Sequence, residues 1–198
     1  SAHVSTVHIP IVDELEIDSE SVDKTKQRPL VMAYYYMWYT EDYWHRLKRR
    51  EDPLMGLYAS LDPNVVEQHI EWAVAHGIEA FVVSFDQRNY RSIHATLSNV
   101  SNIDKIRIIL HYETMGIQEA DPAFSATSLD WNDERNAQYV CDLLRKVSDL
   151  YFSEPWYLRI EDRPAMVFYI TRQWKGTQHV HMNRMRAAMG DFYSIGDH

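Results

Sequence analysis

The hydrophobic positions along the chain form short, nearly continuous runs that alternate with amphipathic stretches. A continuous apolar run bounded by polar residues predicts a strand buried on both faces, as in a parallel sheet. Such runs cover residues 30–39, 78–86, 105–113, 163–170 and 191–197. A helical period of apolar residues marks 61–77, the first half of 89–103, 131–152 and 181–190. Strand and helix therefore alternate four times, which predicts an α/β fold with a parallel sheet and right-handed crossovers.

The first of these helices has recognisable ends. Asp62 is a suitable N-cap, Pro63 fits the first turn, and Gly77 ends the helix. Its buried face is predicted to carry Val66, Ile70, Ala73 and Val74. The polar residues from Thr40 to about Ser60 precede this helix and are expected to form a long loop.

Two architectures begin with this order of elements: a doubly wound, flavodoxin-like sheet and a (β/α)₈ barrel. No G-x-G-x-x-G or Walker sequence follows any predicted strand, so no nucleotide cofactor is expected. A complete barrel needs about 250 residues. The chain of 198 residues therefore corresponds to about the first five strands of a (β/α)₈, TIM-barrel type fold. Residues 1–28 are polar and acidic and are expected to be a flexible lead-in, which leaves 29–198 for the half-barrel.

Charge and composition exclude several classes of function. The net charge of −9, from 20 basic and 29 acidic residues, argues against a sequence-independent nucleic-acid binder, which needs a surface that neutralises phosphates. The basic run from Arg46 to Arg50 is expected to be a solvated face. No apolar run reaches about 18 residues, so no membrane span is predicted. The single cysteine, Cys141, lies in an apolar helical pattern and is expected in the core rather than as a nucleophile.

Polar, charged and aromatic residues gather where each predicted strand ends. In parallel α/β folds the carboxyl ends of the strands carry the functional groups. The residues at these ends are Met37, Trp38, Tyr39, Ser84, Phe85, Asp86, His111, Tyr112, Glu113, Tyr169, Thr171, Arg172, Asp197 and His198. Aromatic rings, carboxylates and an arginine suit a carbohydrate, because sugar C–H faces stack on rings and hydroxyls bind planar bidentate groups. The sequence therefore indicates a glycan partner.

The aromatic residues of the first strand divide between packing and binding. Tyr34, Tyr35 and Tyr36 lie in mid-strand, where rings usually pack, and are expected mainly to fill the barrel or its helix interface. Trp38 and Tyr39 lie at the strand end and are expected at the site.

Two carboxylates are candidates for acid–base chemistry. Glu113 and Asp86 each follow an apolar strand, where loss of solvent can raise the pKa of a carboxyl. A glycosidase needs two carboxylates that flank one bond, and these two could form the pair. The alternative for Glu113 is a structural ion pair with an arginine such as Arg172, and the same alternative applies to Asp86. The histidines of 179–181 and 111–113 lack the spacing of a structural zinc site, so no metal is expected, and 178–183 is expected to be a loop beside a helix start.

Four blocks of the sequence resemble one known group of proteins. They are VMAYYYMWY (31–39), LMGLYASLDPNVVEQHIEWAVAHGIEAFVVSF (54–85), LHYET (110–114) and PWYLRIEDRPAMVFYITRQW (155–174). In this order they resemble the glycoside hydrolase family 99-like proteins, in which the first block typically reads A-Y-Y-Y-P-W-Y. Met37 stands where that family usually has proline, Phe85 where it has tryptophan, and Asp162 where it has glycine.

The resemblance implies a (β/α)₈ barrel that acts on α-mannosides or related polysaccharides. It implies that Tyr36, Trp38 and Tyr39 line the sugar cleft and that His69 is structural. The expected substrate-binding set is Tyr36, Trp38, Tyr39, Asp86, His111, Glu113, Tyr169 and Arg172. In the family the catalytic carboxylates lie on a later strand, beyond this sequence, which would leave Glu113 a binding or supporting residue. A secreted, periplasmic or secretory-lumen location is the expectation that accompanies the resemblance.

Two functions remain open from the sequence, beside the weaker alternative of a flavodoxin-like five-strand domain with some other ligand. In the first, the chain is the N-terminal half of a glycoside hydrolase whose catalytic groups lie in the rest of the barrel. In the second, it is a non-catalytic subunit that binds glycans or has a structural role, and a partner chain completes its half-barrel. An open parallel edge after the fifth strand would be prone to aggregation if nothing covered it. The rest of the barrel covers this edge in the first function, and a partner chain covers it in the second.

Overall fold

The computed structural model describes residues 29–114 and 129–196. The strands are β1 (Met32–Tyr35), β2 (Ala80–Phe85), β3 (Arg107–Tyr112), β4 (Arg159–Ile160), β5 (Arg163–Phe168) and β6 (Tyr193–Gly196). The helices are α1 (Glu41–Arg46), α2 (Pro63–Ala75), α3 (Tyr90–Leu97), α5 (Glu134–Tyr151) and α6 (Gln178–Met189). Short 3-10 turns, η1 (Ile103–Lys105) and η3 (Thr171–Gln173), precede β3 and follow β5.

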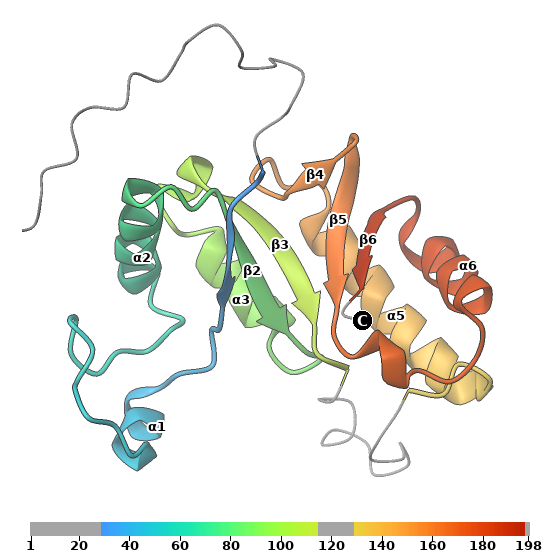
Figure 1. Ribbon diagram of the computed structural model, residues 1–198, viewed down its shortest axis with the longest axis horizontal. Helices are drawn as coiled ribbons and strands as arrows, with labels where there is room; N and C mark the ends of the chain where they lie inside the picture. Colours follow the sequence, from blue (N-terminus) through green and yellow to red (C-terminus); the bar gives the residue numbers. More distant parts are fainter. Residues whose placement is uncertain (1–28, 115–128, 197–198) are drawn as a thin grey trace, which may run out of the picture.

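The sheet is parallel and its strands follow chain order. The sequence of hydrogen-bonded neighbours is β1, β2, β3, β5 and β6, each pair parallel, and the short β4 pairs antiparallel with β5 (Figure 1). A doubly wound sheet reverses its strand order part-way, and no reversal occurs among the strands of the described ranges. The sheet is therefore singly wound, as in a barrel, and the flavodoxin-like alternative is excluded.

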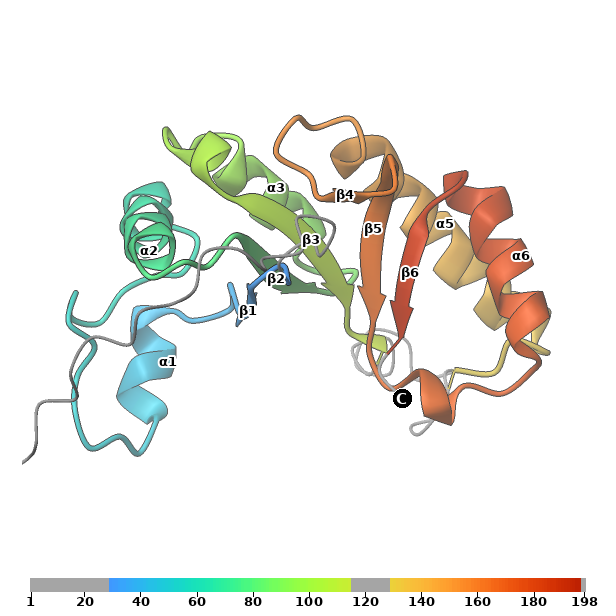
Figure 2. The same cartoon turned by 45° about the horizontal axis from the view of Figure 1, so that its top comes forward.

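The helices that connect the strands cover one face of the sheet. Figure 2 shows α2, α3, α5 and α6 along the same side of the strands. Right-handed crossovers in a constant direction produce this arrangement. We call the opposite side the open face. In a closed barrel this face is the interior, and the carboxyl ends of its strands carry the functional site.

Alternate residues of the central strands face two different clusters of buried side chains. In β2, Phe81, Val83 and Phe85 join the large core between sheet and helices. Val82 belongs instead to a small cluster on the open face, together with Ile109, Leu158, Ala165 and Val167. The prediction of strands buried on both faces is confirmed for β2, whose six residues are all buried.

That prediction is wrong for the first strand. β1 has four residues, Met32–Tyr35, rather than the ten expected, and alternate side chains are exposed. Its open-face residues Met32 and Tyr34 are 38% and 58% exposed. Tyr35, on the helix side, stacks on Phe81 at 4.4 Å and accordingly packs as expected. The side chains of β1 are exposed because, in the described ranges, β1 pairs with β2 alone and no strand lies along its other edge.

Three local expectations also need correction. The polar segment after Thr40 contains helix α1, because the Thr40 hydroxyl accepts a hydrogen bond from the Tyr43 amide at 3.1 Å and caps it. Residues 178–183 lie in α6 rather than in a loop. Val74 is 40% exposed, and Val65 occupies the buried face of α2 instead. The N-cap of α2 is confirmed, since the Asp62 carboxylate accepts from the Asn64 amide at 2.9 Å.

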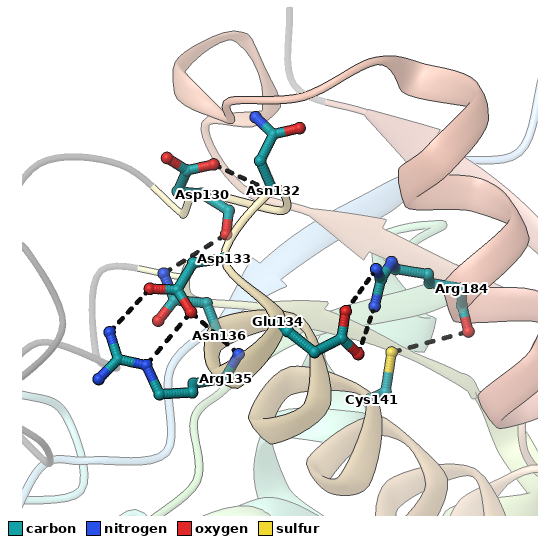
Figure 3. Close-up of polar contacts among 8 residues, drawn as sticks. All are labelled: Asp130, Asn132, Asp133, Glu134, Arg135, Asn136, Cys141 and Arg184. Atoms are coloured by element: carbon teal, nitrogen blue, oxygen red, sulfur yellow. Dashed lines mark hydrogen bonds and ion pairs between the residues drawn. The ribbon is translucent and has the colours of Figure 1, made fainter.

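Helices α5 and α6 are joined by polar contacts around Arg184 (Figure 3). Arg184 donates to both carboxylate oxygens of Glu134, at 3.0 and 2.7 Å. The Arg184 carbonyl accepts a weak hydrogen bond from the Cys141 Sγ at 3.7 Å. Burial raises the pKa of the Cys141 thiol, which disfavours the nucleophilic thiolate. The expectation that Cys141 is a core residue is confirmed.

The hairpin between β4 and β5 was not foreseen from the sequence. Its two turn residues, Glu161 and Asp162, have φ values of 50° and 61°, as a two-residue type I′ turn requires. Residues with a Cβ are strained in this left-handed region, and glycine is not. This geometry explains why glycine, the residue usual at the position of Asp162 in the resembling family, fits there.

We expect Asp162→Gly to raise the free energy of unfolding by about 0.5 kcal/mol, because relief of left-handed strain outweighs the added freedom of the unfolded chain. Chemical denaturation of both proteins measures the difference. Asp162→Ala is the control and should lower stability, because alanine lacks the local hydrogen bonding by which aspartate tolerates this conformation. Equal stability of the two variants would contradict the explanation.

Candidate functional site

The carboxyl ends of β2, β3 and β5 bring three polar residues together on the open face. Ser84 and His111 are register partners in adjacent strands. The amide of Tyr169, just beyond β5, donates to the Tyr112 carbonyl at 3.2 Å and so extends the β3–β5 pairing. The Thr114 hydroxyl donates to the Tyr169 carbonyl at 3.1 Å and ties the two strand ends again. These side chains are therefore positioned by regular parallel strand pairing, and not by the geometry of the loops.

Glu113 is held at the centre of this group. Its amide donates to the Phe85 carbonyl at 2.9 Å, which continues the β2–β3 ladder by one residue. Its carboxylate accepts a hydrogen bond from the Ser84 hydroxyl at 2.8 Å and lies 3.5 Å from Nδ1 of His111. Burial raises the pKa of the Glu113 carboxyl, the nearby Asp86 raises it further, and the Ser84 hydrogen bond partly offsets both. The side chain is still 20% exposed, so a ligand can reach it.

The expected alternative role for Glu113, an ion pair with Arg172, does not occur among the described residues. Arg172 is exposed in η3 and lines a cavity of about 680 Å³ on the helix side of β5 and β6. Phe168 and Met185, which belong to the helix-side core, line the same cavity. The structure therefore does not bring Arg172 to Glu113, although both follow strand ends.

His111 lies between two tyrosine rings. Its own ring is buried, 3% exposed, with the Tyr34 centroid at 5.3 Å and the Tyr169 centroid at 5.4 Å, both edge-on. Edge-to-face packing of this kind fixes the orientation of a ring. The histidine thus connects the rings of β1 with the end of β5.

A row of exposed rings extends from this point along the end of β1. We call Tyr34, Tyr36 and Trp38 the aromatic row. Their centroids are 6.5 Å apart for Tyr34–Tyr36 and 4.6 Å apart for Tyr36–Trp38. The three side chains are 58%, 37% and 44% exposed. Between them Met37 turns inward and is buried in the core. Three large rings on one open surface form a platform of the kind that sugar faces stack on.

The aromatic row and Glu113 belong to one site. Burial raises the pKa of the Tyr36 hydroxyl, and the next contributions come from Glu113, Tyr34 and Tyr169. A phenol is affected in this way only by charged or titratable groups close to it. The geometry gives the same connection through His111, which lies 3.5 Å from Glu113 and packs on the Tyr34 ring at 5.3 Å.

Tyr39 is partly covered by the loop that follows it. Its ring stacks on Trp44 of α1 at 4.7 Å. Its backbone amide donates to the Ser60 hydroxyl at 3.0 Å, and its carbonyl accepts from the Ser60 amide at 2.9 Å. Trp44 in turn donates from Nε1 to the Tyr58 carbonyl at 2.8 Å. Tyr39 therefore forms a wall beside the aromatic row.

Asp86 is close to Glu113 but is engaged elsewhere. It is 6% exposed. Its carboxylate accepts from Nε of Arg88 at 2.9 Å and from the Arg88 amide at 2.7 Å. These bonds close the turn that leads into α3. Asp86 acts on the site through its charge rather than through a free oxygen aimed at a ligand.

The remaining expected positions are accounted for as follows. Nδ1 of His69 lies 2.8 Å from the Tyr35 hydroxyl on the helix side, which confirms a structural histidine. Asp197 and His198 lie outside the described residues. Within 29–114 and 129–196, no three His, Cys, Asp or Glu side chains are close enough to hold a metal ion. No described helix has both the length and the hydropathy needed to cross a lipid bilayer.

Tyr34 is the member of the site that sequence reasoning placed in the core. A signal for it was present, because residues two apart on a strand point to the same face and Tyr36 was already expected in the cleft. The prediction for Tyr34 instead followed the general rule that aromatic rings in the middle of a strand pack in the core. It failed here because the open-face side of β1 is not covered.

No protein-family model and no curated protein matches the chain. Solved structures do. The GH99 endo-α-mannosidase from Bacteroides thetaiotaomicron matches over 84% of this chain with a TM-score of 0.62 at 16% sequence identity. The described part of the chain has the fold of about half of the GH99 barrel. A structure of that enzyme with bis-tris-propane gives a TM-score of 0.61 at 18% identity, and a glycoside hydrolase-like protein gives 0.61 at 17%.

The GH99-like fold confirms the expected architecture at the level of the backbone. The chain spans about half the length of these structures, 54% of the first and 51% of each of the other two. Identities below 20% relate folds and do not transfer residue roles, since one fold can host many functions.

Desolvation of Glu113 leads to a prediction about stability and pH. A carboxyl whose pKa is raised by folding is destabilised in its charged form, so its favourable contribution is present below its usual pKa near 4.5 and lost as the pH rises through the folded-state value. Glu113→Gln should therefore match the wild type near pH 4 and be more stable at neutral pH. Replacing a desolvated residue of this kind is expected to raise the free energy of unfolding by about 0.5–2 kcal/mol.

Thermal unfolding of both proteins across this pH range measures the effect. Glu71→Gln is the control, because hydrogen bonds from Lys105 and Asn102 lower the pKa of Glu71. That variant should be less stable than the wild type at neutral pH, with the difference vanishing as the pH falls. Glu113→Gln and Glu71→Gln shifting in the same direction at neutral pH would contradict the assignment.

Proposed function

We propose that the chain is part of a glycoside hydrolase-like barrel that binds α-mannoside-type oligosaccharides at the carboxyl ends of its strands. The observation that carries the proposal is the aromatic row beside a partly buried carboxylate on the open face. A contiguous exposed apolar surface of this kind is a feature of ligand-binding grooves. The endo-α-mannosidase activity of the structurally similar enzyme supports the sugar class.

The chemistry of the site suits a pyranose. The faces of Tyr36 and Trp38 offer apolar surface to the C–H groups of a sugar ring, and Glu113 offers oxygens to its hydroxyls. The Ser84 hydroxyl holds the carboxylate by a hydrogen bond, so little side-chain freedom is lost when a sugar binds. We assign Glu113 a binding or supporting role and leave the catalytic carboxylates of the hydrolase to the rest of the barrel.

Titration calorimetry tests binding directly. α-Linked mannotriose and mannotetraose should bind the protein, whereas β-linked cello-oligosaccharides of the same length should bind at least about ten-fold more weakly. Equal affinities, or no heat with any of these glycans, would contradict the proposal. Hydrolysis is tested separately, by incubating α-mannan with the longest polypeptide in which this chain is encoded and measuring new reducing ends.

The second candidate is a non-catalytic glycan-binding or structural subunit. One observation favours it: β1 and β6 each have one strand neighbour in the described ranges, so both outer edges offer unpaired backbone groups. A partner chain that adds strands would satisfy them. Native mass spectrometry of the protein from its source distinguishes the two, since a stable complex with a different chain and no hydrolysis supports the subunit and a hydrolytically active single chain excludes it.

A further inference from the structure

Among the described residues, no lysine or arginine is paired with the Glu113 carboxylate at the centre of the candidate site. The Ser84 hydroxyl donates to this carboxylate at 2.8 Å, and Nδ1 of His111 lies 3.5 Å from it. Asp86 brings a second carboxylate close by. Arg88 is bound to Asp86 at 2.9 Å within its own turn. Titratable groups from three strands face Glu113: Tyr36 after β1, Asp86 after β2 and His111 in β3.

The surfaces around this charge also favour cations. The faces of tyrosine and tryptophan rings are negative and attract ammonium groups, most strongly where water is partly excluded. The aromatic row provides three such rings, and His111 connects its Tyr34 to Glu113, with a ring centroid 5.3 Å from Tyr34 and Nδ1 3.5 Å from the carboxylate. A carboxylate beside several electron-rich rings is the combination by which proteins recognise protonated amines.

We propose that this site selects glycans that carry a protonated amine on the sugar lying against Glu113, and that it discriminates against glycans that carry a carboxylate there. The inference rests on the proposed glycan-binding function and adds the charge class of the preferred sugar. A neutral sugar can bind by stacking and by hydroxyl contacts. An amino sugar adds a charge-assisted hydrogen bond to Glu113, whereas a uronate places like charges together.

A matched series of ligands tests the proposal. α-Linked mannobiose is compared with analogues in which the C6 hydroxyl of either residue is replaced by an amine or oxidised to a carboxylate. Titration calorimetry at about pH 7.5 keeps the amine charged and lies above the usual pKa of histidine. At least one amine analogue should bind about ten-fold more tightly than mannobiose, and the carboxylate analogues more weakly.

The Glu113→Gln variant identifies the residue responsible. In it, the ratio of amine to neutral affinity should fall to about one, while mannobiose itself binds somewhat more weakly than to the wild type. Glu71→Gln removes one negative charge of α2, where Glu71 bonds to Lys105 and Asn102 and not to the site, and should leave the ratio unchanged.

The outcomes separate the inference from the function on which it rests. Amine analogues that bind no better than mannobiose, or a preference that survives in Glu113→Gln, would overturn the inference and leave the glycan site in place. A failure of all three sugar classes to bind would remove the proposed function and the inference with it.

Discussion

Replacing Trp38 with alanine is expected to weaken oligosaccharide binding by about ten- to a hundred-fold. Trp38 is 44% exposed and contacts Tyr36 at 4.6 Å, so its free ring surface is available to a sugar. Large rigid aromatic side chains carry much of the affinity where they are covered by a ligand. Trp38 lies outside the buried core, so the substitution should leave the thermal midpoint nearly unchanged. Calorimetric titration with α-mannotriose measures the loss.

Trp72 provides a matched control. It is 37% exposed, lies on α2 on the helix side of the sheet, and contacts the ring of His69 at 5.7 Å. Trp72→Ala removes a similar exposed ring far from Glu113 and should bind the glycan like the wild type. If both variants lost affinity equally, or if neither did, the aromatic row would not be the glycan surface.

Replacing Gly176 with alanine is expected to destabilise the fold by roughly 2–5 kcal/mol. Gly176 has a φ of +102°, and an added Cβ would lie 2.9 Å from Nε2 of His181 and 3.2 Å from the Cβ of Trp131. Neither neighbour can move easily. His181 stacks on Trp131 at 5.3 Å and bonds through Nε2 to the Lys175 carbonyl, and Trp131 is fully buried.

A substitution at Gly56 separates the two causes of the lost stability, which are backbone strain and steric clash. Its φ of +75° is also left-handed, but nothing lies within 4 Å of an added Cβ. Gly56→Ala should cost about 1 kcal/mol from backbone strain alone. Denaturant unfolding of both variants gives the difference, which reports the steric clash. A Gly176→Ala variant as stable as Gly56→Ala would show that the loop before α6 is not packed as described.

Helix α2 and strand β2 illustrate what a local pattern can predict. Asp62 and Pro63 start α2 because capping and proline geometry depend only on neighbouring residues. The residues of β2 are buried on both faces because the run is apolar without alternation. The prediction that Val74 is buried was wrong. A helix leaves part of its apolar stripe exposed when the stripe is wider than the surface against which the helix packs.

The site shows where local patterns stop being informative. Ser84, His111, Glu113 and Tyr169 could be expected near one another, because parallel strands bring their carboxyl ends to one edge. Arg172 follows a strand end as well, yet it lies on the helix side, because η3 turns the chain away after β5. The direction of a chain after its last ladder hydrogen bond depends on turn geometry, which this sequence did not reveal.

The sequence by itself determined the order of strands and helices, the ends of the best-capped helix and the edge of the sheet at which polar groups meet. These features depend on hydrophobic period and on contacts between near neighbours. Only the tertiary structure decided that the sheet is singly wound and that Tyr34 joins Tyr36 and Trp38 on an open face. It also decided that Glu113 accepts a hydrogen bond from Ser84 and lies beside His111 rather than Arg172. The physical reason is that these outcomes depend on which strands become neighbours and on which face remains uncovered, and both are set by contacts between residues distant in the chain.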